Sequence, residues 1–172
     1  GARTHTNSWG SSAASEQAKY NSETEDVDDR AHYYDRYYSV AAGLTILFAA
    51  GNDGPNSGTV SPPATAKNVI SVGNHQNRYN GAPDSMMIGS SRGPTEDGRI
   101  KPDLVAPGGY VRSCRAQEAT DTGSATWNSN YYLEYTGTSM ATPNAAGAAV
   151  MVREYLIEIA QRPSPQGALV KA

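Results

Sequence analysis

The sequence predicts an α/β domain with a mostly parallel sheet. Residues 3–9 alternate weakly like a strand, residues 27–41 have helical periodicity, and residues 44–50 form a continuous apolar segment. A strand, a helix and a strand in succession are typical of a βαβ unit, in which the two strands are parallel. The chain has 172 residues, which suits one domain or a large part of one and is enough to bury a sizeable core.

Composition excludes several classes of protein. The chain carries 14 Lys+Arg against 17 Asp+Glu, a net charge of -3, so it lacks the basic surface that nucleic acid requires. Its 38% hydrophobic and 18% charged residues argue against wholesale disorder. The longest apolar run, residues 40–51, is too short to span a bilayer. Cys114 is the only cysteine, which rules out an intrachain disulfide and a cysteine-based zinc site.

The first predicted helix has one apolar face. Its positions recur at helical spacing: Val27, Ala31, Tyr34, Tyr38 and Ala41. Acidic residues lie at its start, where the helix dipole favours negative charge: Asp26, Asp28 and Asp29. A metal site is the alternative for this cluster, but its spacing fits no known ligand loop, which favours a solvated helix start. Gly43 is placed to cap the C-terminal end, and residues 10–25 before the helix are predicted as a loop.

The remaining elements follow from local composition. Residues 44–50 are predicted as a strand buried on both faces, and residues 52–61 as a loop. Further short strands are predicted at 68–73, 104–106, 110–114 and 131–135, with mostly loop between 75 and 103. Residues 140–159 form the second helix, which Arg162-Pro163 ends. Small apolar residues surround its first half, so that half is expected to be buried almost all round. A further element could begin at 166–172.

A serine lies at the start of this second helix, within GTSMATP at residues 137–143. The first N–H groups of a helix lack partners and carry the positive end of its dipole, so a negative oxygen formed beside Ser139 would be stabilised. Pro143 leaves the carbonyl of Ser139 without its helical partner. From spacing alone, Ser139 could equally be an ordinary N-cap.

An asparagine follows the buried strand, within AAGNDG at residues 49–54. Ligands of open α/β sheets bind beyond the carboxyl ends of the strands, and Asn52 could present a side-chain amide there. The alternative is that Asn52 only forms a turn.

Together these segments resemble the subtilisin-like serine proteases (subtilases). Residues 137–143 resemble the family's serine motif, and residues 49–54 resemble the block that carries its oxyanion-hole asparagine. Residues 7–10 are similar to the strand that pairs with the substrate, and residues 60–73 are similar to the pocket floor and the next strand. Two more segments, 90–94 and 101–108, resemble further family blocks. The amino-acid sequence of these segments is most similar to that of the alkaline, oxidatively stable subgroup of subtilases.

The resemblance implies a fold and a set of site residues. The fold is a partial subtilisin-like three-layer α/β/α sandwich. Ser139 is the implied nucleophile and Asn52 the implied oxyanion donor of an endopeptidase that cleaves polypeptides. The implied substrate-binding residues are Ser8, Trp9, Gly10, Ala50, Gly51 and Ser61. The family is mostly secreted, which implies an extracellular protein, and its chemistry requires no cofactor. Structural calcium is possible, on carbonyls near Ala64, Ala66 and Val69.

The sequence shows no partner that could activate Ser139. Subtilases order their triad Asp, His, Ser, yet no Asp or His-Gly-Thr motif precedes Ser139 here. The three histidines, His5, His32 and His75, do not lie where the family's base would fall. We therefore expect residues 1–172 to be the C-terminal portion of a catalytic domain, nearly inert alone. Such a piece should need the N-terminal part of the domain, associate with itself or be poorly stable.

Two other functions share features with this sequence. The α/β-hydrolase elbow places its acid and histidine after the serine, but no Asp or His follows Ser139, and Ala141 replaces the final glycine of that motif. A non-catalytic, protease-like binding module remains an alternative, because the deciding motifs would lie upstream.

Overall fold

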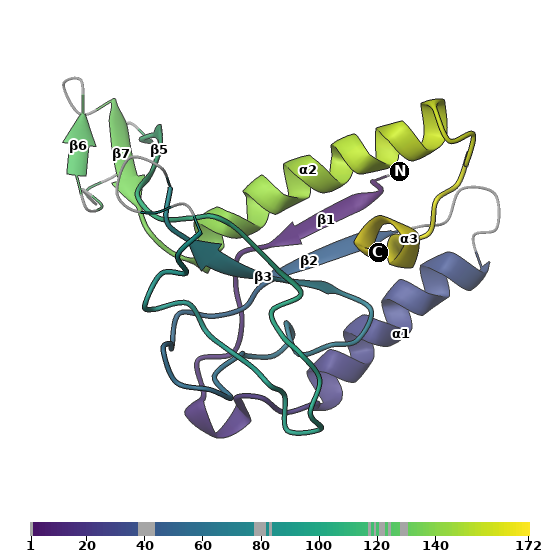
Figure 1. The fold of residues 1–172 in the computed structure, drawn as a ribbon, viewed down its shortest axis with the longest axis horizontal. Helices are drawn as coiled ribbons and strands as arrows, with labels where there is room; N and C mark the ends of the chain where they lie inside the picture. The colour runs from purple at the N-terminus through teal and green to yellow at the C-terminus, as the bar shows by residue number, and fades with distance from the viewer. Residues whose placement is uncertain are drawn as a thin grey trace.

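A four-stranded parallel sheet is the centre of the fold (Figure 1). Its strands neighbour one another in chain order: β1 (Thr4–Asn7), β2 (Thr45–Ala49), β3 (Ile70–His75) and β4 (Leu104–Pro107). All three pairings are parallel. The predicted α/β fold with a mostly parallel sheet is therefore confirmed.

The computed structural model describes most of the chain. The described residues are 2–37, 44–77, 82, 84–116, 118, 120, 123, 125–127 and 131–172, without the side chains of 32–37 and 127.

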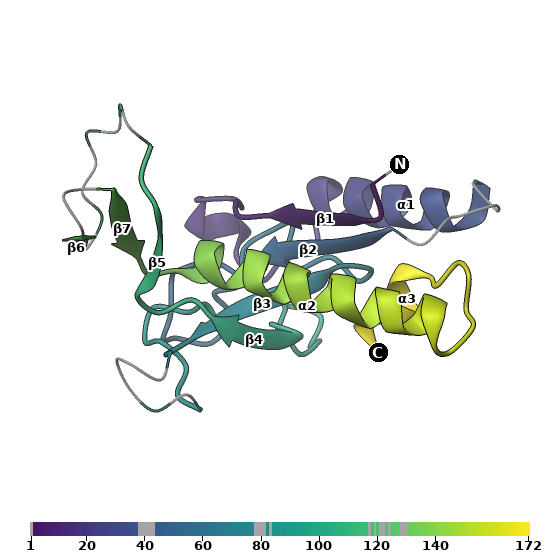
Figure 2. The same cartoon turned by 90° about the horizontal axis from the view of Figure 1, so that it is seen from above.

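Helices cover both faces of this sheet. On one face lie α2 (Thr138–Glu158), which contacts all four strands, and the short α3 (Gly167–Lys171), which contacts β2. On the other face lies α1 (Ser22–Tyr37), as the two views at right angles show (Figures 1 and 2). A single 3-10 turn, Ala14–Glu16, precedes α1. The result is a three-layer arrangement.

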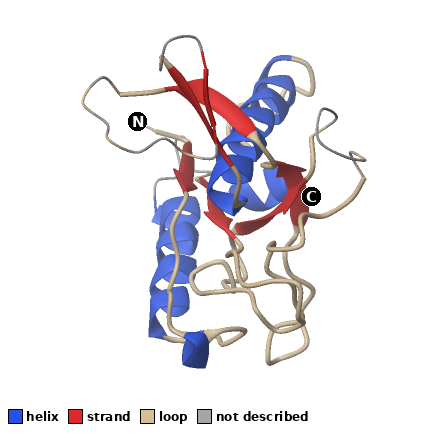
Figure 3. Cartoon of the chain, turned by 90° about the vertical axis from the view of Figure 1, so that its left-hand side faces the viewer, coloured by secondary structure: helices blue, strands red, loops and turns tan. Residues whose placement is uncertain are grey.

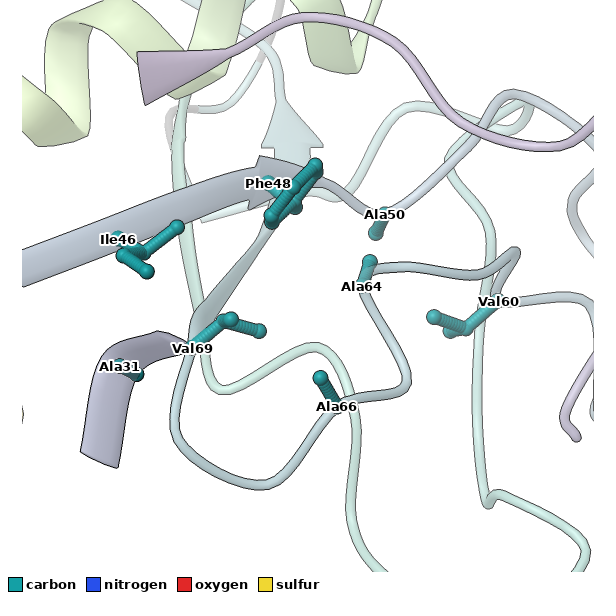
Figure 4. Close-up of a cluster of buried hydrophobic side chains, with 8 residues drawn as sticks. All are labelled: Ala31, Ile46, Phe48, Ala50, Val60, Ala64, Ala66 and Val69. Carbon is teal, nitrogen blue, oxygen red and sulfur yellow. The ribbon is translucent and has the colours of Figure 1, made fainter. Parts of the chain in front are cut away.

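The central strand β2 divides the core in two. Every residue of β2 is buried, as a continuous apolar segment predicts. Because side chains alternate along a strand, Ile46 and Phe48 join the cluster that faces α1 (Figure 4), whereas Leu47 joins the cluster under α2. Burying each of these large side chains stabilises the fold by about 1.5–3 kcal/mol.

Helix α1 begins five residues earlier than the apolar face predicts. Asn21 and Thr24 bind each other reciprocally: the Thr24 N–H donates to Asn21 Oδ1 (3.2 Å) and the Asn21 N–H donates to Thr24 Oγ1 (2.8 Å). This Asn-x-x-Thr pair satisfies free N–H groups at the helix start. It is a local signal that the periodicity of the apolar face does not contain. The predicted cap at Gly43 lies outside the described residues.

The prediction of a wholly solvated acidic cluster was wrong for Asp28. Asp26 and Asp29 are exposed, but Asp28 is buried and accepts the backbone N–H groups of Lys67 (2.9 Å) and Asn68 (2.7 Å). Its carboxylate thus ties α1 to the loop before β3, which the helical spacing alone could not show. Among the described residues, no group of three or more His, Cys, Asp or Glu side chains could hold a metal ion.

Helix α2 differs from prediction in its burial. Its end at Glu158 is one residue from the predicted end at 159, and it begins two residues earlier than predicted, at Thr138. Its Ala141, Ala145 and Ala146 pack on the sheet, but the opposite side of the first half is exposed, at Gly147 and Ala148 among others. The expected all-round burial of the first half was therefore wrong, because only one face of α2 meets the sheet. No helix in the described part of the chain is long and apolar enough to cross a membrane.

A small antiparallel sheet stands beside the start of α2 (Figures 1 and 3). Its order is β5 (Val111–Cys114), β7 (Tyr132–Tyr135) and β6 (Ala125–Trp127). The sequence predicted β5 and β7 but not β6, whose three residues are too short for a detectable alternation. Strand β7 leads directly into Gly137 and Ser139, so this sheet helps to set where α2 begins.

Candidate active site

The residues singled out by the sequence meet at one edge of the sheet. Ser8 follows β1, Asn52 follows β2 by three residues, and the start of α2 reaches both of them. The carboxyl ends of parallel strands lie at the same edge, where α/β proteins bind their ligands. The separation in sequence between Asn52 and Thr138 is 86 residues, so only the fold brings them together.

Ser139 is not the N-cap of α2. The N-cap residue is Gly137, whose backbone is extended and which has no side chain to make a capping hydrogen bond. The Ser139 hydroxyl is half-buried and donates to the carbonyl of Ser8 (3.2 Å). The alternative of an ordinary capping serine is therefore wrong. In the described part of the chain, the Ser139 N–H has no hydrogen-bond partner.

Ser8 and Ser139 hold each other in place. The Ser8 hydroxyl donates to the carbonyl of Ser139 (2.7 Å), while Ser139 donates to the carbonyl of Ser8. The carbonyl of Ser139 is the one that Pro143 deprives of its helical N–H, as the sequence predicted. Ser8 thus supplies from β1 the hydrogen bond that the helix cannot make.

Asn52 is joined to the same helix start. Its Oδ1 accepts both the N–H (2.9 Å) and the hydroxyl (3.1 Å) of Thr138. Asn52 therefore caps α2 from another part of the chain, which goes beyond the turn-forming alternative. Its Nδ2 has no hydrogen-bond partner among the described residues. This nitrogen lies close to the helix start, since a Cβ built onto Gly137 would be only 3.6 Å from it. Two free donors, this amide and the Ser139 N–H, thus belong to residues at the positive end of α2.

The loop that carries Asn52 is pinned by Ser91. The Ser91 N–H donates to the carbonyl of Gly51 (3.0 Å), and Ser91 Oγ accepts the N–H of Asp53 (3.1 Å). Gly51 has a φ of +110°, and a Cβ there would lie 2.7 Å from Ser91 Oγ. Glycine is therefore required at this position. Sequence reasoning missed the role of Ser91, although it lies in one of the quoted blocks.

Three of the predicted substrate-binding residues, Gly10, Ala50 and Gly51, lie against Ser61. A Cβ added at Gly10 would lie 3.7 Å from the Ser61 Cβ, and one at Gly51 would lie 3.2 Å from its Oγ. The Ser61 hydroxyl is buried and has no hydrogen-bond partner in the described chain. A buried hydroxyl without a partner is uncommon in folded proteins. A contact of Ser61 with substrate stays a prediction.

Trp9 and Ala50 take different positions in this region. Trp9 is 53% exposed and sets its indole edge against the ring of Phe48, at 5.2 Å between centroids. Ala50 is fully buried in the core cluster facing α1, and its N–H and carbonyl already bind Val72 and Ser61. A direct contact of Ala50 with substrate stays a prediction.

Strand β4 anchors the start of α2. The Gly137 N–H donates to the carbonyl of Gly108 (3.0 Å), and Asn144 Nδ2 donates to the carbonyl of Pro107 (2.7 Å). A Cβ at Gly108 would lie 2.6 Å from the carbonyl oxygen of Gly137. The close approach that Gly108 permits was missed because the sequence does not show which segments touch.

No described imidazole contacts the Ser139 hydroxyl. The ring of His5 binds Asn7 (3.1 Å) and the ring of His75 binds the carbonyl of Gln76 (2.6 Å). The side chain of His32 lies outside the described residues. The carbonyl of Ser8, which does accept the Ser139 hydroxyl, cannot take up its proton. The site thus offers a nucleophile position and two donors, and its described part contains no base beside them.

Comparison with known proteins identifies the family. The subtilase family model matches residues 1–171, so this chain belongs to the subtilase family. The chain is 38% identical over 122 residues to serine protease AprX of Bacillus subtilis (strain 168), covering 65% of this chain and 26% of AprX. It is 31% identical over 121 residues to a subtilisin of Bacillus sp. (strain TA39), covering 67% of this chain and 26% of that protein.

Solved structures agree with the fold. Sphericase shares 26% identity and a TM-score of 0.61, over 98% of this chain and 46% of that one. The self-cleaved protease domain of PatA has a TM-score of 0.66 at 18% identity, over 99% of this chain and 52% of that one, and supports the fold alone. The chain thus spans about a quarter of these curated relatives and about half of these solved neighbours. Family and relatives support a serine protease.

Proposed function

We propose that this chain carries the nucleophile and the oxyanion hole of a serine endopeptidase. Ser139 Oγ attacks the carbonyl carbon of a peptide bond, while its proton passes to a histidine base. The Asn52 amide and the Ser139 N–H stabilise the oxygen that becomes negative. The C–N bond then breaks, the base returns the proton to the leaving amine, and water hydrolyses the acyl-enzyme. This chemistry requires no cofactor.

One observation carries this proposal: Asn52 uses only its oxygen to hold Thr138. This leaves the amide nitrogen of Asn52 available, and Asn52 is exposed, so a ligand can reach it. Here the unpaired Nδ2 and the unpaired Ser139 N–H belong to groups held together through Thr138. A water-exposed or ligand-bound oxygen is the natural acceptor for both.

The base and its acid come, in this proposal, from polypeptide that this chain does not contain. The support is that neither His5 nor His75 reaches Ser139 and that the Ser139 hydroxyl binds a carbonyl instead. The chain alone should therefore be nearly inert. The rival function, a protease-like binding module, differs in having no such base anywhere in the full protein.

The substrate is proposed to be an extended polypeptide. Residues 8–10 directly follow β1 and would pair with the substrate backbone as an added strand. The floor at Ser61 carries an uncharged hydroxyl, and no charged side chain touches it among the described contacts. We propose a preference for apolar or small polar residues before the cleaved bond.

The partner of this chain is proposed to be the N-terminal part of the catalytic domain, with self-association as the outcome in its absence. In the described structure, β1 pairs on one side only. The outer face of α2 exposes large apolar side chains: Val150, Met151, Tyr155 and Ile159. Such surfaces mark interaction sites. By family, we also propose an extracellular protein; the alkaline subgroup stays a prediction.

A fluorophosphonate probe tests the function, because it labels only an activated serine. We expect the 172-residue chain to remain unlabelled and the protein that includes the upstream sequence to be labelled at Ser139, with Ser139→Ala as control. Labelling of the isolated chain would refute the need for an external base. A correctly folded, upstream-complete protein without label or peptidase activity would instead favour the binding module.

A further inference from the structure

A cluster of charges lies at the opposite end of the sheet from Ser139. Asp103, just before β4, is its central anion, with Oδ2 2.7 Å from Lys101 Nζ and Oδ1 3.0 Å from Lys171 Nζ. The N–H of Ser71 also donates to Asp103 Oδ2 (2.7 Å). Lys171 lies in α3, so one carboxylate joins the beginnings of two strands to the last helix.

The same cations bind carbonyls of the loop before β3. Lys171 Nζ donates to the carbonyls of Val69 (2.8 Å) and Lys67 (3.2 Å), and Lys101 Nζ lies 3.4 Å from the carbonyl of Val69. The guanidinium of Arg99 donates to the carbonyl of Thr65 (2.6 Å). Three carbonyls within five residues are therefore bound by cationic side chains.

Backbone carbonyls gathered around a carboxylate are the oxygen ligands that calcium prefers. The family resemblance pointed to this loop for a structural calcium ion, on carbonyls near Ala64, Ala66 and Val69. At Val69, which is one of these three, the residues present do not fit that ion. Calcium would need to approach Val69 within about 2.3–2.6 Å, yet an ammonium nitrogen already lies 2.8 Å from that oxygen. A divalent ion there would face strong repulsion from two neighbouring positive charges.

We infer that the ammonium groups of Lys101 and Lys171 replace a structural metal ion at this corner of the sheet. They neutralise Asp103, bind the carbonyl of Val69 and close the loop against β3, β4 and α3. Lys101 is 5% exposed, so its ammonium is enclosed as a bound ion would be. The site is thus occupied by the chain itself and takes up no calcium.

Calcium-dependent melting of the chain tests this inference. We expect the same melting temperature in millimolar calcium and in EDTA for the unmodified chain and for the control Lys67→Gln, whose side chain lies over the Tyr20 ring rather than at Asp103. The double variant Lys101→Met/Lys171→Met frees the carboxylate and the Val69 carbonyl. It should melt lower in EDTA and recover part of the loss on adding calcium, because a ligand that binds only the folded state stabilises it.

A second measurement does not depend on the variant folding. Nitrogen-15 NMR of the unmodified chain should show slowly exchanging ammonium signals for Lys101 and Lys171. These signals should be unchanged by millimolar calcium. Displacement of either signal by calcium, or a melting temperature of the unmodified chain that rises with calcium but not in its Asp103→Asn variant, would overturn the inference.

Discussion

Two groups of residues at opposite ends of the parallel sheet differ in how their polar atoms are paired. At the carboxyl end, Asn52 Nδ2, the Ser139 N–H and the Ser61 hydroxyl have no partners among the described residues. At the amino end, Lys101 and Asp103 bind each other and nearby backbone groups. Unpaired groups cost stability but remain available to a substrate, whereas paired groups hold the fold together. Mutations at the first end should therefore change turnover, and mutations at the second should change stability.

The largest effect is expected at Asn52, in the protein that includes the upstream sequence. Asn52→Ala should lower turnover about 100- to 1,000-fold with little change in KM, as the loss of one oxyanion-hole donor does in a subtilisin. Peptide hydrolysis measures it.

Asn52→Asp separates the two roles of this residue. It keeps an oxygen for Thr138, and its charge suits a helix start, but it removes the amide donor. We expect an unchanged or higher melting temperature together with the loss of turnover. If Asn52→Asp kept full turnover, Asn52 would be only a cap.

The second effect is on stability, at Asp103. Asp103→Ala leaves the buried ammonium of Lys101 without its anion and should cost on the order of 3 kcal/mol of unfolding free energy. Asp97→Ala is the matched control, because Asp97 forms an exposed ion pair with Arg99 and should change stability little. Urea titration measures both. An Asp103 variant as stable as the control would contradict the contrast between the two ends.

Low pH should destabilise the fold through the carboxylate of Asp103. Burial alone would raise the pKa of Asp103, but the hydrogen bonds from Lys101 and Ser71 outweigh it and hold the pKa below its usual value. A group with a lowered folded-state pKa stabilises the fold above its unfolded pKa, and this contribution is lost as the pH falls through the folded value. Unfolding free energy should thus decline below about pH 4. This decline should be shallower in the Asp103→Asn variant. Urea titrations at several pH values measure the unfolding free energy, and an equal decline with pH in both proteins would argue against the prediction.

A smaller effect, about 1 kcal/mol, is expected for the hydroxyl of Ser8. Ser8→Ala removes the donor to the Ser139 carbonyl. Pro143→Ala can restore the helical N–H, so the cost of Ser8→Ala should shrink in that background. A double-mutant cycle on unfolding free energies measures the coupling. Additive costs would show that Ser8 does not compensate for Pro143.

The smallest effect concerns Met140, which is half-buried beside Ser139. Its sulfoxide is polar and bulkier than the thioether, so peroxide should partly inactivate the upstream-complete enzyme. Mass spectrometry locates the oxidation, and Met140→Leu is the matched control. Full activity with Met140 oxidised would refute this expectation.

Local patterns were enough for most elements. The continuous apolar segment predicted β2, and helical periodicity predicted α1 and α2, because these signals reflect burial of one strand or one face. They failed where the partner was distant. Asp28 was expected in solvent, and the exposed face of α2 was expected to be buried, because periodicity does not show which segment packs against which face.

The sequence by itself determined the family and the parallel sheet, and it singled out Ser139 and Asn52 as candidates, because each of these inferences rests on short motifs and local spacing. Only the tertiary structure decided their partners: Thr138 on Asn52, Ser8 on the carbonyl freed by Pro143, and two distant lysines on Asp103. These contacts join residues far apart in the chain. Their geometry depends on how strands and helices pack, which no local spacing contains.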